Sequence, residues 1–182
     1  MIFITVGTHE QQFDRLIRYA DVLIAEGIIN EKMIIQTGYS TYVPKYAEWS
    51  RFLSCDQMLR YLRDARIVIT HGGPSSFMKV LTFGKIPVVM PRMKKYGEHI
   101  NNHQQCFVKA VYRKYHNIIP VESMEDLKKT IANYEEITAD MSAEYKMNNS
   151  QFADKLDILV SDMMKVNNNA GKTTAKHYYS GL

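Results

Sequence analysis

Three short polar segments contain the residue types that bind phosphates and hydroxyl groups. They cover residues 7–12, 70–76 and 91–105, and each lies between a short β-branched apolar run and a helical pattern. Free backbone N–H groups at a strand-to-helix turn bind anions, and the dipole of the helix that follows favours negative charge there. The three segments therefore predict a site for a phosphorylated ligand.

The segment 70–76 is the most informative of the three. Two glycines, Gly72 and Gly73, precede a proline and the hydroxyl residues Ser75 and Ser76. Missing side chains allow a diphosphate to approach the backbone, and the turn supplies several N–H donors. A plain capped turn, with one serine as N-cap, is the simpler interpretation. Neither G-x-x-x-x-G-K-[ST] nor G-x-G-x-x-G is present, which disfavours ATP and NAD.

The segment 91–105 combines cations, imidazoles, a carboxylate and amides. Arg92 and Lys95 are suited to neutralising phosphate, whereas Glu98 and the amides are suited to pairing with sugar or ribose hydroxyls. His99 and His103 are four residues apart, a spacing that would also suit a metal, but no third ligand is visible. We therefore expect no metal and no cofactor. A solvated basic loop is the alternative.

Apolar periodicity predicts the elements that position these segments. Short β-branched runs alternate with helical patterns, which is typical of a parallel sheet covered by helices on both faces, an α/β, Rossmann-like doubly wound fold. The strands are expected at 2–6, 33–37, 49–53, 66–70, 86–90 and 118–121. The helices are expected at 13–24, 56–64, 75–83, 101–112 and 124–134. In such a sheet the ligand binds at the carboxyl ends of the strands.

Length and composition limit the remaining choices. The 182 residues suffice for one domain and a tail, and we expect a nucleotide-sugar-binding domain over 1–135, a helical extension over 136–166 and a flexible tail over 167–182. Two cysteines and no apparent secretion signal predict reduced thiols in the cytoplasm. A net charge of +4 is mild. The sequence has no dense basic stripe of the kind that binds nucleic acid, so we do not expect a nucleic-acid partner. No run is apolar and long enough to span a membrane.

Several motifs resemble one enzyme family. They are T-H-G-G-P-S-S at 70–76, G-K-I-P-V-V-M-P at 84–91 and H-Q at 103–104. Together they resemble the donor-binding domain of glycosyltransferase family 28. V-G-T-H-E at 6–10 with F-D-R-L at 13–16, and P-R-M-K-K-Y-G-E-H at 91–99, are similar to the short one-domain members. Those members are the catalytic subunit of the eukaryotic dolichol-linked N-acetylglucosaminyltransferase and bacterial counterparts in capsule and exopolysaccharide clusters.

The resemblance implies the C-terminal half of a GT-B glycosyltransferase split between two polypeptides. The expected donor is a UDP-sugar, and the expected transfer is inverting and metal-independent, onto a polyprenyl-diphosphate-linked sugar. A membrane-anchored subunit would bind this lipid-linked acceptor and hold the chain at the inner face of the membrane. An apolar face left open by the absent half would favour a homo-oligomer of the isolated chain.

The resemblance also implies residue roles. Gly7 and Thr8 match a loop near the diphosphate, and Phe52 and Leu53 match the uracil-contacting edge. The diphosphate and ribose turn is matched by His71, Gly72, Gly73, Ser75 and Ser76. Gln104 matches a glutamine that reads sugar hydroxyls, and His103 precedes it in the same motif.

Two questions stay open at this point. Family members often have a glutamate after the glycine turn to bind the ribose, and Met78 occupies the matching position here. This departure supports an alternative, a non-catalytic UDP-sugar-binding or scaffolding subunit that enhances a partner transferase. For the catalytic base, His9 and Glu98 are the candidates within the chain, with His99 in reserve; in two-domain relatives the base lies on the acceptor half.

Overall fold

A six-stranded parallel sheet forms the centre of the described part of the chain. The computed structural model describes residues 1–144. Its strands follow the order β3-β2-β1-β4-β5-β6, and every neighbouring pair is parallel. The strands are β1 (Ile2–Thr5), β2 (Met33–Gln36), β3 (Glu48–Ser50), β4 (Ile67–His71), β5 (Val88–Met90) and β6 (Ile119–Pro120). The predicted α/β, Rossmann-like fold is confirmed.

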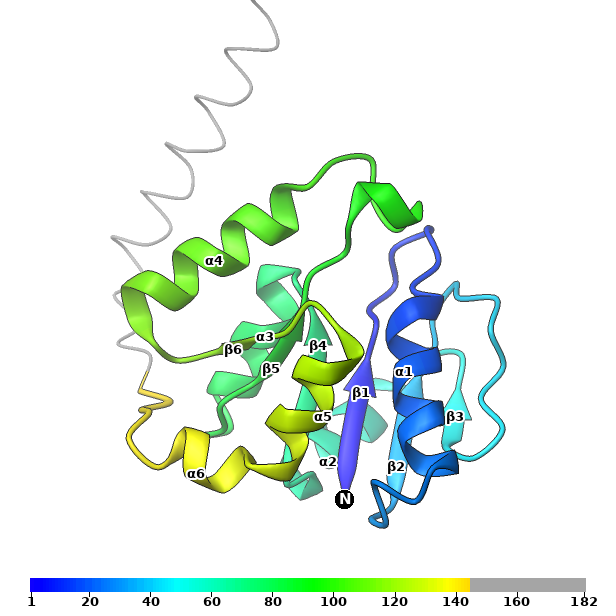
Figure 1. Cartoon of the computed structure of the whole chain (residues 1–182), viewed down its shortest axis with the longest axis horizontal. Coiled ribbons are helices and arrows are strands. Elements are labelled where there is room, and N and C mark those ends of the chain that lie inside the picture. Colours follow the sequence, from blue (N-terminus) through cyan, green and yellow to red (C-terminus); the bar gives the residue numbers. More distant parts are fainter. Residues whose placement is uncertain (145–182) are drawn as a thin grey trace, which may run out of the picture. The chain divides into compact units, whose positions relative to one another are not determined.

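Helices cover both faces of this sheet (Figure 1). They are α1 (Asp14–Ala25), α2 (Cys55–Asp64), α3 (Pro74–Leu81), α4 (His103–Tyr115), α5 (Met124–Ala132) and α6 (Tyr134–Thr138), with a 3₁₀ turn η1 (Lys94–Tyr96). One face packs against α1 and α5, as the shared cluster of Ile4, Leu16 and Leu127 shows. The opposite face packs against α2, α3 and α4 through two smaller clusters.

Alternation along the strands explains why both faces are apolar. In β1, Ile2 and Ile4 lie in the cluster under α1, whereas Phe3 lies in the cluster under α2 and α3. All four residues of β1 are buried. A strand that is buried on both sides is an unbroken apolar run, the pattern from which the central strands were predicted.

Local signals fix the helix starts. Ser54 and Gln57 form a capping box at α2, Ser123 and Asp126 form another at α5, and Pro74 occupies the first turn of α3. The five predicted helices are present with small shifts at their ends. The 3₁₀ turn η1 is too short to produce a helical period and was not predicted, whereas the short helix α6 lies where the predicted helical extension begins.

The strand order places the site. The sequence order reverses between β1 and β4, so the helices that follow these two strands lie on opposite faces and the turns after them diverge. We call residues 7–12 and 72–76 the switch-point turns. Two of the three polar segments thus meet where ligands bind in this fold class.

The C-terminal elements are only partly described. The first compact unit of the chain is Met1–Glu144. The predicted helical extension at 136–166 is described only as far as residue 144, and the predicted tail at 167–182 lies outside the described residues. In the described part, no helix has the length and apolarity needed to cross a membrane.

Candidate functional site

His71 lies at the carboxyl end of β4 and occupies the centre of the switch-point turns. A Cβ on Gly7 would lie 2.5 Å from His71 Nε2, and a Cβ on Gly73 would lie 2.2 Å from His71 Cε1. The imidazole therefore fills the space that these two glycines leave open. Gly7 also has a φ of +76°, a conformation that favours glycine. Glycine is therefore required at both positions to make room for the His71 ring, whether or not a ligand also approaches the backbone there.

Hydrogen bonds set the tautomer of His71. The Gly73 N–H donates to Nδ1 over 3.0 Å, and Nε2 lies 2.9 Å from Ser76 Oγ. Burial, followed by the nearby charge of Arg92, lowers the pKa of His71 to about 4, so the ring is neutral at pH 7. Because Nδ1 accepts, the single proton of the neutral ring is on Nε2 and is donated to Ser76.

This polarity determines what Ser76 can do. Its oxygen accepts from His71, which leaves the hydroxyl proton available for a further acceptor. His71 cannot remove that proton, because its Nε2 already carries one. The pair is therefore unsuited to nucleophilic catalysis and suited to donating a hydrogen bond to an anion.

Gln104, in the first turn of α4, ties the third polar segment to the switch-point turns. Its Oε1 accepts from the N–H of Gly72 and from the N–H of Arg92, each over 3.1 Å. A Cβ on Gly72 would lie 3.0 Å from the Gln104 Cβ, so the glycine is needed for this approach. The side chain that was predicted to read sugar hydroxyls thus also joins the ends of β4 and β5.

Arg92 does not present its guanidinium to solvent. It is 1% exposed and donates to the carbonyl oxygens of Val6, Gln11 and Gln12 over 2.8–2.9 Å. Burial lowers its pKa to about 10, which leaves it charged at neutral pH. We predicted that Arg92 neutralises phosphate. In the structure its Nη1 and Nη2 hold the 7–12 turn through these carbonyls, whereas its buried Nε has no hydrogen-bond partner among the described residues.

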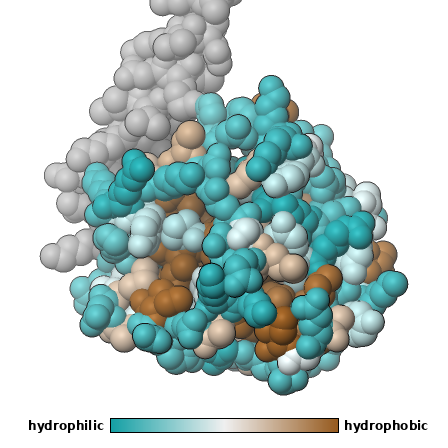
Figure 2. Space-filling model, in the orientation of Figure 1, coloured by the Kyte–Doolittle hydropathy of each residue, from teal (hydrophilic) through white to brown (hydrophobic). Residues whose placement is uncertain are grey.

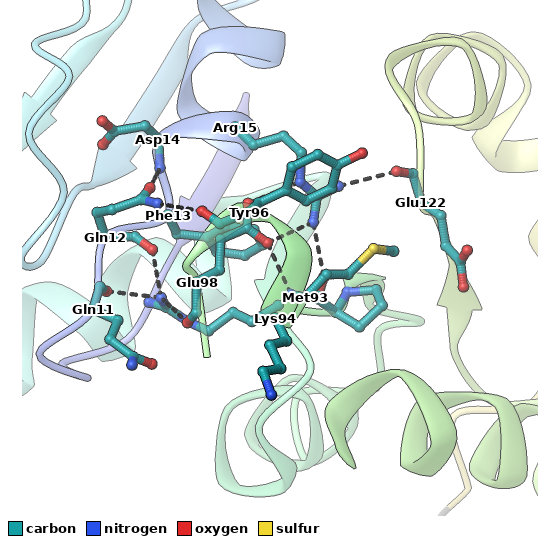
Figure 3. Close-up of polar contacts among 12 residues, drawn as sticks. Gln11, Gln12, Phe13, Asp14, Arg15, Met93, Lys94, Tyr96, Glu98 and Glu122 are labelled. Atoms are coloured by element: carbon teal, nitrogen blue, oxygen red, sulfur yellow. Dashed lines mark hydrogen bonds and ion pairs between the residues drawn. The ribbon is translucent and has the colours of Figure 1, made fainter. Parts of the chain in front are cut away.

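Glu98 is also buried, at 0% exposure, in an ion pair with Arg15 (Figure 3). Its two oxygens accept from Arg15 Nε at 2.8 Å and Nη2 at 2.9 Å, and Oε2 also accepts from the Met93 N–H. Arg15 donates further to the carbonyls of Pro91 and Glu122. A carboxylate enclosed in this way has no surface from which to reach a substrate hydroxyl, so its geometry is that of an anchor for the 91–102 connection.

The structure brings the other two candidate bases together. The imidazoles of His9 and His99 lie with centroids 5.3 Å apart, on two different turns. Each Nδ1 accepts from a backbone N–H two residues ahead, of Gln11 and of Asn101 respectively. Burial, then the charges of Arg92 and His99, lowers the pKa of His9 below its ordinary value, which favours the neutral imidazole.

The remaining predicted site residues lie on the surface around these turns. Thr8, Ser75, Lys95 and His103 are exposed. Lys95 places its ammonium 4.7 Å from the centroid of the Tyr96 ring.

Phe52 and Leu53, which follow β3, face different surroundings. Leu53 packs against the apolar cluster under α2, whereas Phe52 is exposed and meets Tyr39 edge-on at 5.4 Å. The guanidinium of Arg51 lies over both of these rings. Tyr39 and Arg51 were missed in the sequence, although the adjacent aromatic and basic residues at the end of a strand were a usable signal.

Met78 has a simpler role than its position in the motif suggested. Its side chain packs against the cluster of Phe77, Val89, Val108 and Ile118. The side chain is partly buried, and this packing accounts for an apolar residue at this position of α3.

A metal site is not evident among residues 1–144, where no group of three or more His, Cys, Asp or Glu side chains is arranged to hold an ion. The donors that the site does present are backbone N–H groups, the Ser76 hydroxyl and neutral imidazoles. These groups suit an anionic ligand with hydroxyls.

Comparison with known proteins agrees with this fold. Residues 1–161 match the family described as the glycosyltransferase family 28 C-terminal domain. The chain is also similar to the mouse (Mus musculus) UDP-N-acetylglucosamine transferase subunit ALG13, with 30% identity over 121 residues. That similarity covers 63% of this chain but only 10% of the mouse protein. Since the family match extends over most of the chain, this protein belongs to the glycosyltransferase family 28 C-terminal domain family.

Proposed function

We propose that this chain is the UDP-sugar-binding catalytic subunit of a two-component inverting glycosyltransferase. The observation that carries the proposal is the switch-point turn in which neutral His71 leaves the Ser76 hydroxyl as a donor beside the Ser75 N–H in the first turn of α3. A diphosphate is the ligand that matches a cluster of donors at this place in a Rossmann-like sheet. The family match and the mouse transferase subunit support the choice of a sugar nucleotide.

The reaction would use these donors on the leaving group. An acceptor hydroxyl attacks the anomeric carbon, the bond from that carbon to the diphosphate oxygen breaks, and the released UDP takes the electron pair. The Ser75 N–H, the Ser76 hydroxyl and the dipole of α3 would stabilise the charge that develops there. Gln104, held in place through its Oε1, would present its amide nitrogen to the donor sugar.

The acceptor hydroxyl must also lose a proton to a base. Within this chain His9 is the more accessible candidate, because its side chain is exposed and its lowered pKa favours the neutral imidazole. Its Nδ1 accepts from the Gln11 N–H, so the ring would have to release that hydrogen bond to take up the proton. Glu98 is enclosed by Arg15, and His99 would act next to His9. The acceptor-binding half remains the other source of the base.

The proposed acceptor is a polyprenyl-diphosphate-linked sugar, and the product a capsule or exopolysaccharide precursor carrying a hexose or N-acetylhexosamine. A membrane-anchored subunit would bind that lipid and recruit this chain to the inner face of the membrane. The alternative is a non-catalytic scaffolding subunit that enhances a partner transferase, and the departure at Met78 favours it.

Binding of UDP to a Ser76→Ala variant tests the proposal. The substitution removes one hydroxyl and is expected to weaken UDP binding about tenfold to a hundredfold in isothermal titration calorimetry, since a hydrogen bond to a charged group contributes about 1.5–3 kcal/mol. Ser142→Ala, an exposed serine near the end of the described part, is the control and should bind UDP like the unmodified chain. Unchanged UDP affinity in Ser76→Ala would contradict the assignment of this turn to the diphosphate.

A further inference from the structure

The loop formed by residues 94–100 exposes cations and an apolar side chain in close sequence. Ile100 is 70% exposed, more than any other large hydrophobic residue in the described part. Lys94 and Lys95 are exposed beside it, and Tyr96 is 44% exposed. A single exposed isoleucine is ordinary on a protein surface. Two lysines, an aromatic ring and an isoleucine on one seven-residue loop form a more specific combination.

The base of this 94–100 loop is rigidly held. The buried carboxylate of Glu98 accepts from Arg15 and from the Met93 N–H, Gln12 Nε2 donates to the Tyr96 carbonyl, and Asn102 Oδ1 accepts from the Lys94 N–H (Figure 3 shows the first three). Burying a charged pair has a large desolvation cost, which only good geometry offsets. The outer side chains are therefore presented in a fixed arrangement, which lowers the entropy lost on contact with a surface.

The loop also lies at a particular end of the molecule. It follows β5 at the carboxyl edge of the sheet, the edge at which the switch-point turns are found (Figure 1). In the same orientation, Figure 2 shows hydrophilic residues covering this end, with small hydrophobic areas among them. Glu98 is enclosed by Arg15, so the loop adds no exposed negative charge of its own to offset its lysines.

We propose that the 94–100 loop docks directly on an anionic phospholipid surface. Lysines are attracted to acidic headgroups, tyrosine rings settle at the interface, and an isoleucine inserts among the acyl chains. A protein partner is the less suitable occupant, because lysine is depleted in the cores of protein interfaces. Docking would turn the carboxyl edge of the sheet toward the membrane. Neither UDP nor catalysis is needed for this contact, so it stands or falls separately from the proposed transferase activity.

Co-sedimentation of the full chain with lipid vesicles tests the docking. The chain should bind vesicles of phosphatidylglycerol mixed with phosphatidylcholine, bind pure phosphatidylcholine much more weakly, and lose binding in high salt. Lys94→Gln should lower the partition coefficient about fivefold, as one lysine near an anionic surface contributes about 1 kcal/mol. Ile100→Ser should lower it on the order of tenfold, from the apolar area withdrawn from the bilayer.

Matched variants elsewhere on the chain make the result specific. Lys128→Gln and Ile137→Ser change the same residue types at exposed positions of α5 and α6 and should leave vesicle binding unchanged. Arg113→Gln/Lys114→Gln examines the other exposed basic and aromatic surface, at the end of α4. Each variant is first checked for an unchanged melting temperature. The proposal is overturned if the full chain does not bind anionic vesicles. It is also overturned if Lys94→Gln and Ile100→Ser bind vesicles like the unmodified chain while the α4 or control variants bind less.

Discussion

His71 has no freedom to turn, because Gly7 and Gly73 lie against its ring and two hydrogen bonds hold its nitrogens. A sequence pattern can place a histidine at the end of a strand but cannot show that the neighbouring glycines exist to accommodate it. The consequence is chemical: a fixed, neutral imidazole dictates that Ser76 donates. A charged imidazole would require Nδ1 to give up the Gly73 N–H.

The protonation of His71 can be measured directly. With a pKa of about 4 in the folded state, its imidazole should not titrate between pH 5.5 and 8 in an NMR titration of the ring protons. The unfolded chain binds this proton near pH 6.5, so folding stability should fall as the pH decreases from 6.5 to 4, by on the order of 3 kcal/mol. A His71→Asn variant should lose less stability over that window. Titration of the His71 ring near pH 6.5 would contradict the assigned tautomer and the donor role of Ser76.

At the scale of elements, the connection between β2 and β3 shows how α1 supports the site. Asp14 accepts from the N–H groups of Thr41 and Tyr42, and Asp21 accepts from the Tyr42 hydroxyl and from three successive N–H groups that end at Ala47. Burial alone would raise the pKa of Asp21, but these hydrogen bonds lower it below its ordinary value. Two carboxylates on one helix thus fix the segment that carries Tyr39 and leads into β3.

Asp21→Asn should loosen this connection. Asp21 is 1% exposed, and the amide replaces an acceptor with a donor among N–H groups, so the free energy of unfolding should fall by about 2–4 kcal/mol. Urea unfolding followed by the fluorescence of Trp49, the single tryptophan and a residue of β3, measures the loss. Asp140→Asn, at an exposed position, serves as the control. Equal stability of the two variants would show that the Asp21 hydrogen bonds are not needed to hold the connection.

The strands and helices could be predicted from the sequence, but the long-range side-chain contacts that hold the site could not. Strands such as β4 and β5 are buried on both faces and therefore appear as apolar runs, and helix starts such as Ser54 have local capping signals. Arg15 and Glu98 are 83 residues apart, and no local pattern indicates that they pair. For the same reason Arg92 and Glu98 were predicted as ligand-binding groups: charge in a loop is visible in a sequence, whereas its burial depends on the tertiary packing.

At the scale of the whole molecule, the described residues 1–144 are built on one sheet, and a few buried side chains join the turns after β1, β4 and β5. Arg92 connects the third turn to the first, and Gln104 connects the third to the second. A ligand that contacts any one of these turns would therefore be coupled to the stability of the domain. Binding to the folded chain alone raises the free energy of unfolding by RT ln(1 + [L]/Kd), which is about 2.7 kcal/mol at 100 times Kd.

Thermal unfolding of the full chain with a panel of nucleotides tests the central claim most directly. The panel comprises UDP, UDP-glucose, UDP-galactose, UDP-N-acetylglucosamine, ADP, GDP and NAD at equal concentrations. The proposed donor site predicts that the uridine ligands raise the melting temperature and that ADP, GDP and NAD leave it unchanged. Equal stabilisation by all the diphosphates, or none by the uridine ligands, would contradict a UDP-sugar site at the switch-point turns.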